Sequence, residues 1–187
     1  MASDVTDELP ARPRTVLSTP WLTVREASPA SGRGAGRNWY YVDHPGCALV
    51  LPVTDSGTVL LIRSWRIAVG DWCVEAPAGR CEADESPAET ARRELAEETG
   101  AHGGTLHPLG TTWPSSGSSN ERVHLFLATG VRPGTARPDP DEILRPCPVP
   151  VRRALALAAD GTIQDAPTAL ALLLAERRGL LPAGDDR

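Results

Sequence analysis

Hydrophobic positions recur along the chain in short stretches that are separated by turns rich in glycine, proline and serine. This pattern is typical of strands rather than of long helices. The stretches 47–54 and 58–65 flank Asp55-Ser56-Gly57, a typical hairpin turn, so we expect mostly antiparallel pairing. The predicted strands are 21–27, 38–43, 47–54, 58–65, 72–76, 105–113, 123–129 and 143–149.

Three segments carry helix signals instead. The central one begins with a capping box formed by Ser86 and Glu89, and Gly100 supplies its left-handed stop. The last one has Pro167 in its first turn and Gly179 just beyond its end. The predicted helices are 87–99, 151–159 and 167–178. Strands combined with three helices predict an α+β protein, in which helices sandwich a mixed sheet.

The charge composition excludes several kinds of chemistry. All 19 residues counted as lysine plus arginine are arginines, which excludes a Schiff-base lysine and a Walker-type phosphate loop. The net charge of −5 argues against a nucleic-acid partner bound by a basic surface. An anionic small molecule would need a divalent cation to offset its charge.

The cysteines and the apolar segments indicate a location. The four cysteines form no C-x-x-C pair, which fits free thiols in a reducing compartment. The first residues are acidic and polar, unlike a secretory signal. The longest apolar run, 166–175, is too short for a membrane span. We therefore expect a cytoplasmic protein without a membrane partner.

Acidic residues gather on one edge of the predicted helix 87–99. At about 100° per residue, Glu94, Glu97 and Glu98 fall within an arc of about 100°, beside the apolar stripe. A solvated acidic face is one interpretation of this pattern. The helix is short and Ala-rich, however, and the segment 76–79 brings backbone carbonyls to the same edge. Clustered hard oxygens favour a site for Mg²⁺, with Mn²⁺ as the alternative.

The segment 79–101 resembles the signature of the Nudix hydrolases. Eight positions match: Gly79, Glu85, Arg93, Glu94, Leu95, Glu97, Glu98 and Gly100. One position departs, because Ala101 stands where the family prefers a larger aliphatic residue. The resemblance implies a Nudix-type α/β/α sandwich with a mixed sheet. It also implies hydrolysis of a nucleoside diphosphate linked to another moiety.

The resemblance further implies roles for the matching side chains. Glu94 and Glu98 would be the principal metal ligands, and Glu97 would belong to the same metal and catalytic group. Arg93 would orient a glutamate through its forked guanidinium. Three positions would support the motif: Gly79, Glu85 and Gly100.

Flanking sequence resembles one branch of the family, the ADP-ribose and ADP-sugar pyrophosphatases. The segment 75–79 resembles their E-x-P-A-G lead-in, in which the carbonyl of the residue matching Ala78 binds a metal. The segment 63–66 resembles R-Q-Y-R, which implies that Arg66 contacts substrate. The loop after Pro114 resembles P-G-x-S-x-E with its first glycine replaced, which makes Glu121 a candidate substrate-binding residue.

Two aromatic residues and an acidic loop complete the candidate site. Trp21 and Trp39 resemble positions that stack adenine in this branch, although core tryptophans are an equal alternative. The branch also crosses its N-terminal strands between subunits, which implies a homodimer. Glu142 matches the mobile catalytic glutamate best, with Asp141 or Asp139 as substitutes.

Together these features predict an ADP-ribose diphosphatase that uses Mg²⁺ to form AMP and ribose 5-phosphate. Another nucleotide-sugar such as GDP-mannose, or a dinucleotide, is the alternative substrate. A non-catalytic Nudix-like sensing module is the alternative of a different class. The predicted organisation is a disordered tail at 1–14, an N-terminal antiparallel β lobe at 15–45 that is swapped in the dimer, a hydrolase domain at 46–181 and a tail at 182–187.

Overall fold

The computed structural model describes residues 13–28 and 35–182. Most of the two predicted tails, and residues 29–34 of the predicted N-terminal lobe, lie outside the described residues. The chain divides into two compact units. One unit contains Met1–Pro45 together with Ser115–Arg122, and the other contains Gly46–Pro114 together with Val123–Arg187.

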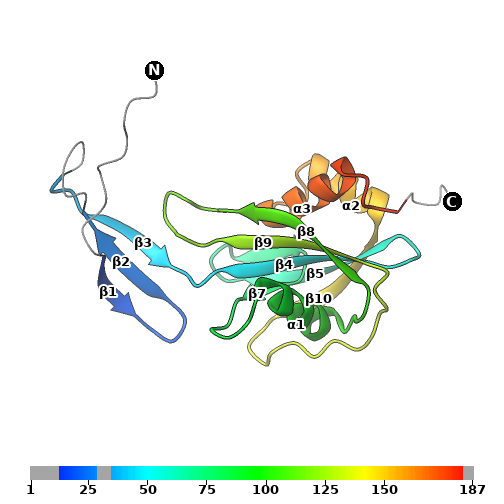
Figure 1. Ribbon diagram of the computed structural model, residues 1–187, viewed down its shortest axis with the longest axis horizontal. Helices are drawn as coiled ribbons and strands as arrows, with labels where there is room; N and C mark the ends of the chain where they lie inside the picture. Colours follow the sequence, from blue (N-terminus) through cyan, green and yellow to red (C-terminus); the bar gives the residue numbers. More distant parts are fainter. Residues whose placement is uncertain (1–12, 29–34, 183–187) are drawn as a thin grey trace, which may run out of the picture. The chain divides into compact units, whose positions relative to one another are not determined.

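The first unit is built on a three-stranded antiparallel sheet. Its strands are β1 (Arg14–Ser18), β2 (Thr23–Ala27) and β3 (Trp39–Asp43), in the order β1-β2-β3 (Figure 1). The segment Ser115–Arg122 joins this sheet, because the Val42 N–H donates to the Ser118 carbonyl at 2.9 Å. No residue of these three strands, all of which lie in the described part of the chain, is buried.

The second unit contains a seven-stranded mixed sheet. The strand order is β10-β5-β4-β9-β8, with β6 paired to β5 and β7 paired to β4. Strands β4 and β9 run parallel, and the other pairs are antiparallel. The strands are β4 (Cys47–Val53), β5 (Thr58–Arg66), β6 (Asp71–Glu75), β7 (Ala78–Arg80), β8 (Thr105–Thr112), β9 (Val123–Thr129) and β10 (Leu144–Pro150).

Helices cover both faces of this sheet (Figure 1). The helix α1 (Pro87–Thr99) packs on one face, and α2 (Val151–Ala159) and α3 (Ala166–Arg177) pack on the other. Strand β4 is buried on both sides, because alternate residues contact the two helix layers. Ala48 and Val50 contribute to the core under α1, whereas Leu49, Leu51 and Val53 contribute to the core under α2 and α3. The α+β prediction and the three-layer sandwich are confirmed.

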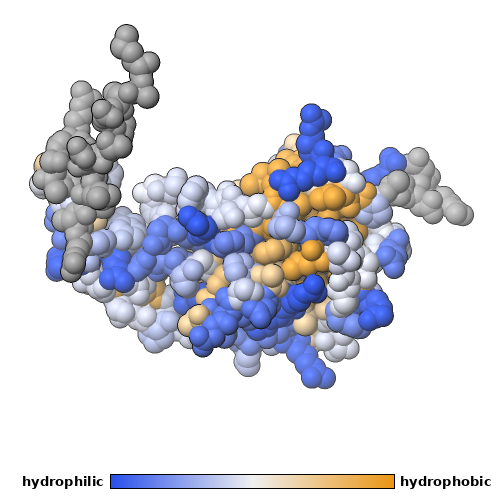
Figure 2. All heavy atoms as spheres, in the orientation of Figure 1, coloured by the Kyte–Doolittle hydropathy of each residue, from blue (hydrophilic) through white to orange (hydrophobic). Residues whose placement is uncertain are grey.

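The surface of the helix layer opposite α1 is partly apolar. Figure 2 shows apolar atoms gathered over α2 and α3. Leu170 and Leu173 of α3 remain 36% and 40% exposed there. Among the described residues, no helix is long and apolar enough to cross a membrane. The four cysteines, all within the described residues, are half-buried and form no disulfide.

The central helix α1 begins and ends where local signals predict. The Glu89 N–H donates to the Ser86 hydroxyl, and the Glu89 carboxylate accepts the Ser86 N–H at 2.8 Å, which closes the capping box. Gly100 has a φ of 69°, a left-handed conformation that favours glycine, and its N–H donates to the Ala96 carbonyl. Because neighbouring residues fix both ends of α1 in this way, the sequence alone predicts its bounds.

All eight predicted strands form, with ends within two residues of the prediction. Two further strands, β1 and β7, were not predicted. In β1 every residue is exposed, so its sequence lacks the alternation that marks a half-buried strand. In β7 only three residues, one of them glycine, pair with β4, and such a short stretch carries no periodicity.

Candidate metal and catalytic site

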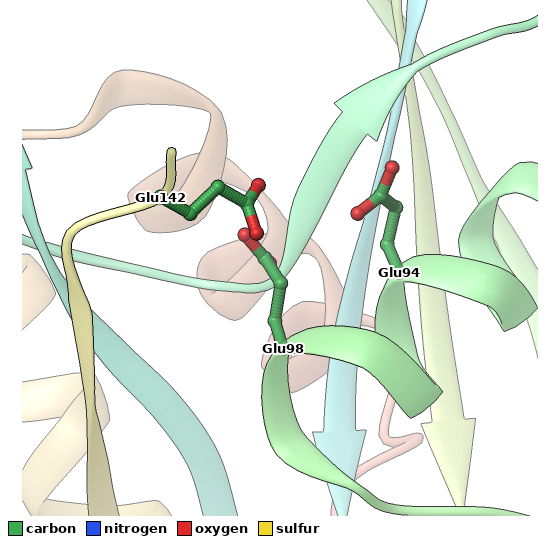
Figure 3. A group of neighbouring side chains, drawn as sticks. All are labelled: Glu94, Glu98 and Glu142. Carbon is green, nitrogen blue, oxygen red and sulfur yellow. The ribbon is translucent and has the colours of Figure 1, made fainter. Parts of the chain in front are cut away.

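Three carboxylates meet beside the C-terminal half of α1. Glu94 and Glu98 lie one turn apart on α1 and are 5% and 3% exposed. Glu142 reaches them from the exposed loop before β10 (Figure 3). One ligand atom from each residue lies within 4.8 Å of the other two. We call Glu94, Glu98 and Glu142 the acidic cluster.

A glycine makes room for the first of these carboxylates. A Cβ added to Gly79, in β7, would lie 1.7 Å from Oε1 of Glu94. Real atoms never approach so closely, so any side chain at this position would push the Glu94 carboxylate out of the cluster. The glycine that opens the Nudix signature is therefore required by space rather than by backbone conformation.

The second carboxylate is held by the backbone. The Ala78 N–H donates to Oε2 of Glu98 at 2.9 Å, across 20 positions of sequence. This bond fixes the Glu98 side chain against the turn between β6 and β7. It also places Ala78, the residue predicted to offer a carbonyl to metal, in direct contact with a cluster residue.

Arg93 links the helix face to the rest of the motif. Its Nε and Nη2 donate to the two oxygens of Glu85 at 2.9 and 3.0 Å, and this pairing lowers the Glu85 pKa to about 2. Its Nη1 donates to Glu94 at 2.6 Å and to Glu97 at 3.0 Å. Arg93 thus binds three glutamates at once, and it holds Glu97 beside the acidic cluster rather than in it.

Burial dominates the electrostatics of the acidic cluster. Removal from water raises the pKa of Glu94 to about 7, against the opposing effect of Arg93. Burial and the neighbouring Glu94 raise the pKa of Glu98 to about 8. These are oxygen ligands of the kind that Mg²⁺ and Mn²⁺ prefer, held close together where their mutual repulsion favours a bound cation. The donor set therefore fits a divalent metal ion.

The loop that carries Glu142 is docked on the C-terminal end of α1. The Arg137 N–H donates to the Glu97 carbonyl at 2.7 Å. Gly134 passes so close to Gly100 that a Cβ on Gly134 would lie 2.3 Å from the Gly100 carbonyl oxygen. Within the loop, the Asp139 N–H donates to the Glu142 carboxylate at 2.9 Å. The helix and the loop thus place their carboxylates together.

The arginine predicted to contact substrate is anchored by a buried glutamate. Arg66 donates from Nε and Nη2 to Glu75, which is 6% exposed, and this pairing raises the pKa of the guanidinium further above its ordinary range. Half of the Arg66 side chain remains exposed. Glu98 acts on the same guanidinium electrostatically, so Arg66 lies near the acidic cluster.

The remaining predicted residues belong to the first unit. Trp21 and Trp39 are 72% and 50% exposed, so neither is a core tryptophan within that unit. The Arg37 guanidinium lies over the Trp39 ring, 4.8 Å from its centroid. Oε1 of Glu121 lies 3.9 Å from Nδ1 of His44.

Two residues beside the site were not singled out from the sequence. Glu75 was read only as the start of the E-x-P-A-G lead-in, yet it is the anchor of Arg66. Thr168 was missed, although Asp165 and Thr168 have the three-residue spacing of a helix N-cap, and the Thr168 N–H donates to Asp165 at 2.9 Å. That spacing is the signal that could have found it.

The sandwich presents two helix glutamates to a glycine-containing turn, a set of oxygen donors that suits a divalent metal ion. The family model of the NUDIX domain matches residues 43–172, which is more than half of the chain. The chain therefore belongs to the Nudix family, as the motif from Gly79 to Gly100 predicted, and it is a Nudix hydrolase. Nudix hydrolases generally use divalent metal ions, in keeping with the acidic cluster.

Individual relatives are similar over most of their length. The chain is 34% identical over 164 residues to a protein of Bacillus subtilis (strain 168) named ADP-ribose pyrophosphatase, covering 87% of this chain and 88% of that protein. It is 32% identical over 145 residues to a GDP-mannose pyrophosphatase of Yersinia enterocolitica, covering 73% of this chain and 75% of that protein. A crystal structure titled ADP compounds hydrolase matches with a TM-score of 0.77 at 20% identity, over 94% of this chain and 97% of that one, which shows the fold.

The raised pKa values predict how the metal-free protein responds to pH. Folded Glu94 and Glu98 bind protons up to pKa values of about 7 and about 8, whereas the unfolded chain releases them near 4.5. Protonation therefore favours the folded state, and this stabilisation is complete below about pH 4.5 and is lost as the pH rises through 7 to 8. Urea unfolding of metal-free protein should show a falling free energy of unfolding across this range.

Two comparisons make this measurement specific. The double substitution Glu94→Gln and Glu98→Gln should flatten the pH dependence, because an amide cannot titrate. Added Mg²⁺ should restore stability to the wild-type protein at pH 8 and should leave the double variant unchanged. A wild-type free energy of unfolding that rises from pH 5.5 to 8 without metal would contradict the assignment.

Proposed function

We propose that this protein is a Mg²⁺-dependent ADP-ribose diphosphatase, which hydrolyses the diphosphate of ADP-ribose to AMP and ribose 5-phosphate. The observation that carries the proposal is the acidic cluster, in which two buried helix carboxylates meet one exposed loop carboxylate. The similarity to the Bacillus subtilis protein supports the choice of substrate. The chemistry is assigned to the hydrolase domain at residues 46–181.

The metal would be held by Glu94, Glu98 and the carbonyl of Ala78, with Glu97 at the edge of the group. A bound divalent cation offsets the charge of the diphosphate and lowers the pKa of a bound water. The Ala78 N–H and Arg93 keep the two buried carboxylates in place. Arg93 also keeps Glu97 beside them, which is why we count both among the catalytic group.

Glu142 is the proposed general base. Its carboxylate lies within reach of Glu94 and Glu98 but comes from an exposed loop, where water can approach it. A carboxylate in this position can accept the proton of the water that attacks phosphorus. The Asp139 N–H donates to the Glu142 carboxylate, so Asp139 contributes through its backbone. Glu142 is therefore preferred over Asp139 and Asp141 as the proposed base.

Substrate contacts are proposed for both units. Glu75 accepts from Nε and Nη2 of Arg66, whose side chain remains half exposed, and Nη1 is the proposed donor to a substrate oxygen. In the first unit, the exposed rings of Trp21 and Trp39 suit stacking on adenine, which is worth about 1–3 kcal/mol per base. Glu121 is the proposed polar contact of that unit.

A substrate panel tests the reaction. Incubation with Mg²⁺ and equal concentrations of ADP-ribose, GDP-mannose and a dinucleotide such as diadenosine diphosphate should yield a nucleoside monophosphate fastest from ADP-ribose, measured as AMP from the adenine substrates and as GMP from GDP-mannose. The similarity to a GDP-mannose pyrophosphatase makes that sugar nucleotide the second candidate. A higher kcat/KM for GDP-mannose would replace the proposed substrate, and binding without products would indicate the sensing module.

Removal of single carboxyl charges tests the roles in the acidic cluster. Glu98→Gln should lower the rate and weaken activation by Mg²⁺, because a principal ligand is lost. Glu142→Gln should lower kcat about 10²–10⁴-fold, the usual contribution of general base catalysis, with little change in KM. Glu176→Gln, an exposed change on α3, is the matched control and should be fully active. A Glu142→Gln variant with wild-type kcat would remove this residue from the mechanism.

We also propose that the protein is a homodimer joined through the first unit and that it acts in the cytoplasm. The sheet of that unit has no buried residue in its strands, and it exposes Leu17 and Tyr40 to 48% and 57%. Leu17 pairs with Val24, which in turn pairs with Val42, so an apolar row crosses one face of the sheet. An apolar face without a core of its own favours association. Four cysteines that form no disulfide among the described residues suit a reducing compartment.

Light scattering on a sizing column tests the assembly. The wild-type mass should be twice that of the 187-residue chain. Leu17→Glu should shift the protein towards the monomer, because it places a charge in the apolar row. Ser18→Glu, on the opposite face of the same exposed strand, should not. A monomeric wild type, or equal behaviour of the two variants, would refute this interface.

A further inference from the structure

The turn between β6 and β7 is held at three consecutive residues by three different elements. The Ala76 N–H donates to Oγ1 of Thr168 in α3 at 2.9 Å. The Pro77 carbonyl accepts the N–H of Val50 in β4 at 2.9 Å. The Ala78 N–H donates to the Glu98 carboxylate in α1 at 2.9 Å. The backbone that touches the acidic cluster is therefore tied to both helix layers and to the sheet between them.

The bond to α3 depends on one hydroxyl group. Thr168 is fully buried, and its hydroxyl donates to Oδ2 of Asp165 at 2.6 Å. The Thr168 N–H donates to the same oxygen at 2.9 Å, as expected for an N-cap. Because its proton is committed to Asp165, the hydroxyl presents a lone pair to the Ala76 N–H. The N-cap of α3 and the hydrogen bond that holds the Ala76 N–H thus share the Thr168 side chain.

The turn has little freedom to find another partner. Ala76 is 1% exposed, and a buried N–H needs an acceptor. Without the Thr168 hydroxyl, the Ala76 amide would have to move towards another acceptor or water. Ala78 lies two residues further along, so such a movement would change both the Ala78–Glu98 bond and the direction of the Ala78 carbonyl.

We propose that Thr168, fixed by Asp165, is a positioning residue for the metal site, acting through the backbone of Ala76, Pro77 and Ala78. It touches neither metal nor substrate, and it sets where Ala78 meets Glu98. Partners that orient metal ligands in this way typically affect metal affinity or activity about 10–100-fold. The inference rests on the proposed function only for its effect on turnover, because metal binding can be measured without substrate.

Two substitutions separate positioning from packing. Thr168→Val keeps the volume of the side chain but removes the hydroxyl, so we expect Mn²⁺ to bind the full-length protein about tenfold or more weakly in calorimetric titration. Thr168→Ser keeps the hydroxyl but removes a buried methyl group, so we expect lower thermal stability with wild-type Mn²⁺ affinity. In turnover, the valine variant should need more Mg²⁺ for half-maximal rate, and the serine variant should not.

The outcomes discriminate clearly. Unchanged Mn²⁺ affinity in a folded valine variant overturns the inference, as does equal weakening in both variants, which would mean that Thr168 only packs. If the valine variant does not fold, Thr168→Ala takes its place in the same calorimetric titration. An unchanged Mn²⁺ affinity of that variant would equally overturn the inference. Wild-type protein that binds Mn²⁺ but leaves ADP-ribose intact would refute the proposed function and leave the positioning role standing.

Discussion

The structure depends on keeping two carboxylates, Glu94 and Glu98, buried beside a sheet. A buried carboxylate is costly unless hydrogen bonds or a cation compensate it. Here Gly79 provides the space for Glu94, and Arg93 provides a positive charge beside it. The Ala78 N–H donates a hydrogen bond to Glu98. Gly79 and Arg93 of the Nudix signature, and Ala78 just before it, therefore each meet a physical need of this pair of side chains. The raised pKa values show that the compensation is incomplete in the protein alone.

Elements with local causes were predictable from sequence. The bounds of α1 follow from its capping box and from Gly100, and the buried strands follow from their alternating or continuous apolar residues. Strand β1 was missed because pairing with β2, rather than burial, defines it. Strand β7 was missed because its three residues are too few to show an alternation, and pairing with β4 defines it.

Site residues on one helix were easier to predict than their partners. Spacing alone put Glu94 and Glu98 on one face, whereas Glu142 followed only from resemblance to a branch of the family. The anchoring of Arg66 by Glu75 and of Ala76 by Thr168 spans 9 and 92 positions, and no local pattern links residues so far apart without the strand register. The sequence also could not show that one nitrogen of Arg93 binds both Glu94 and Glu97, or that Glu97 lies outside the acidic cluster.

These partners explain why a divalent cation would serve the fold and the reaction together. Binding that requires the folded site stabilises the fold by the free energy of binding. The same cation would offset the repulsion among the three carboxylates, and so join α1, the β6–β7 turn and the loop before β10. An acidic protein with a net charge of −5 could then bind the proposed diphosphate, because the cation, rather than the overall charge, would set the local charge at the acidic cluster.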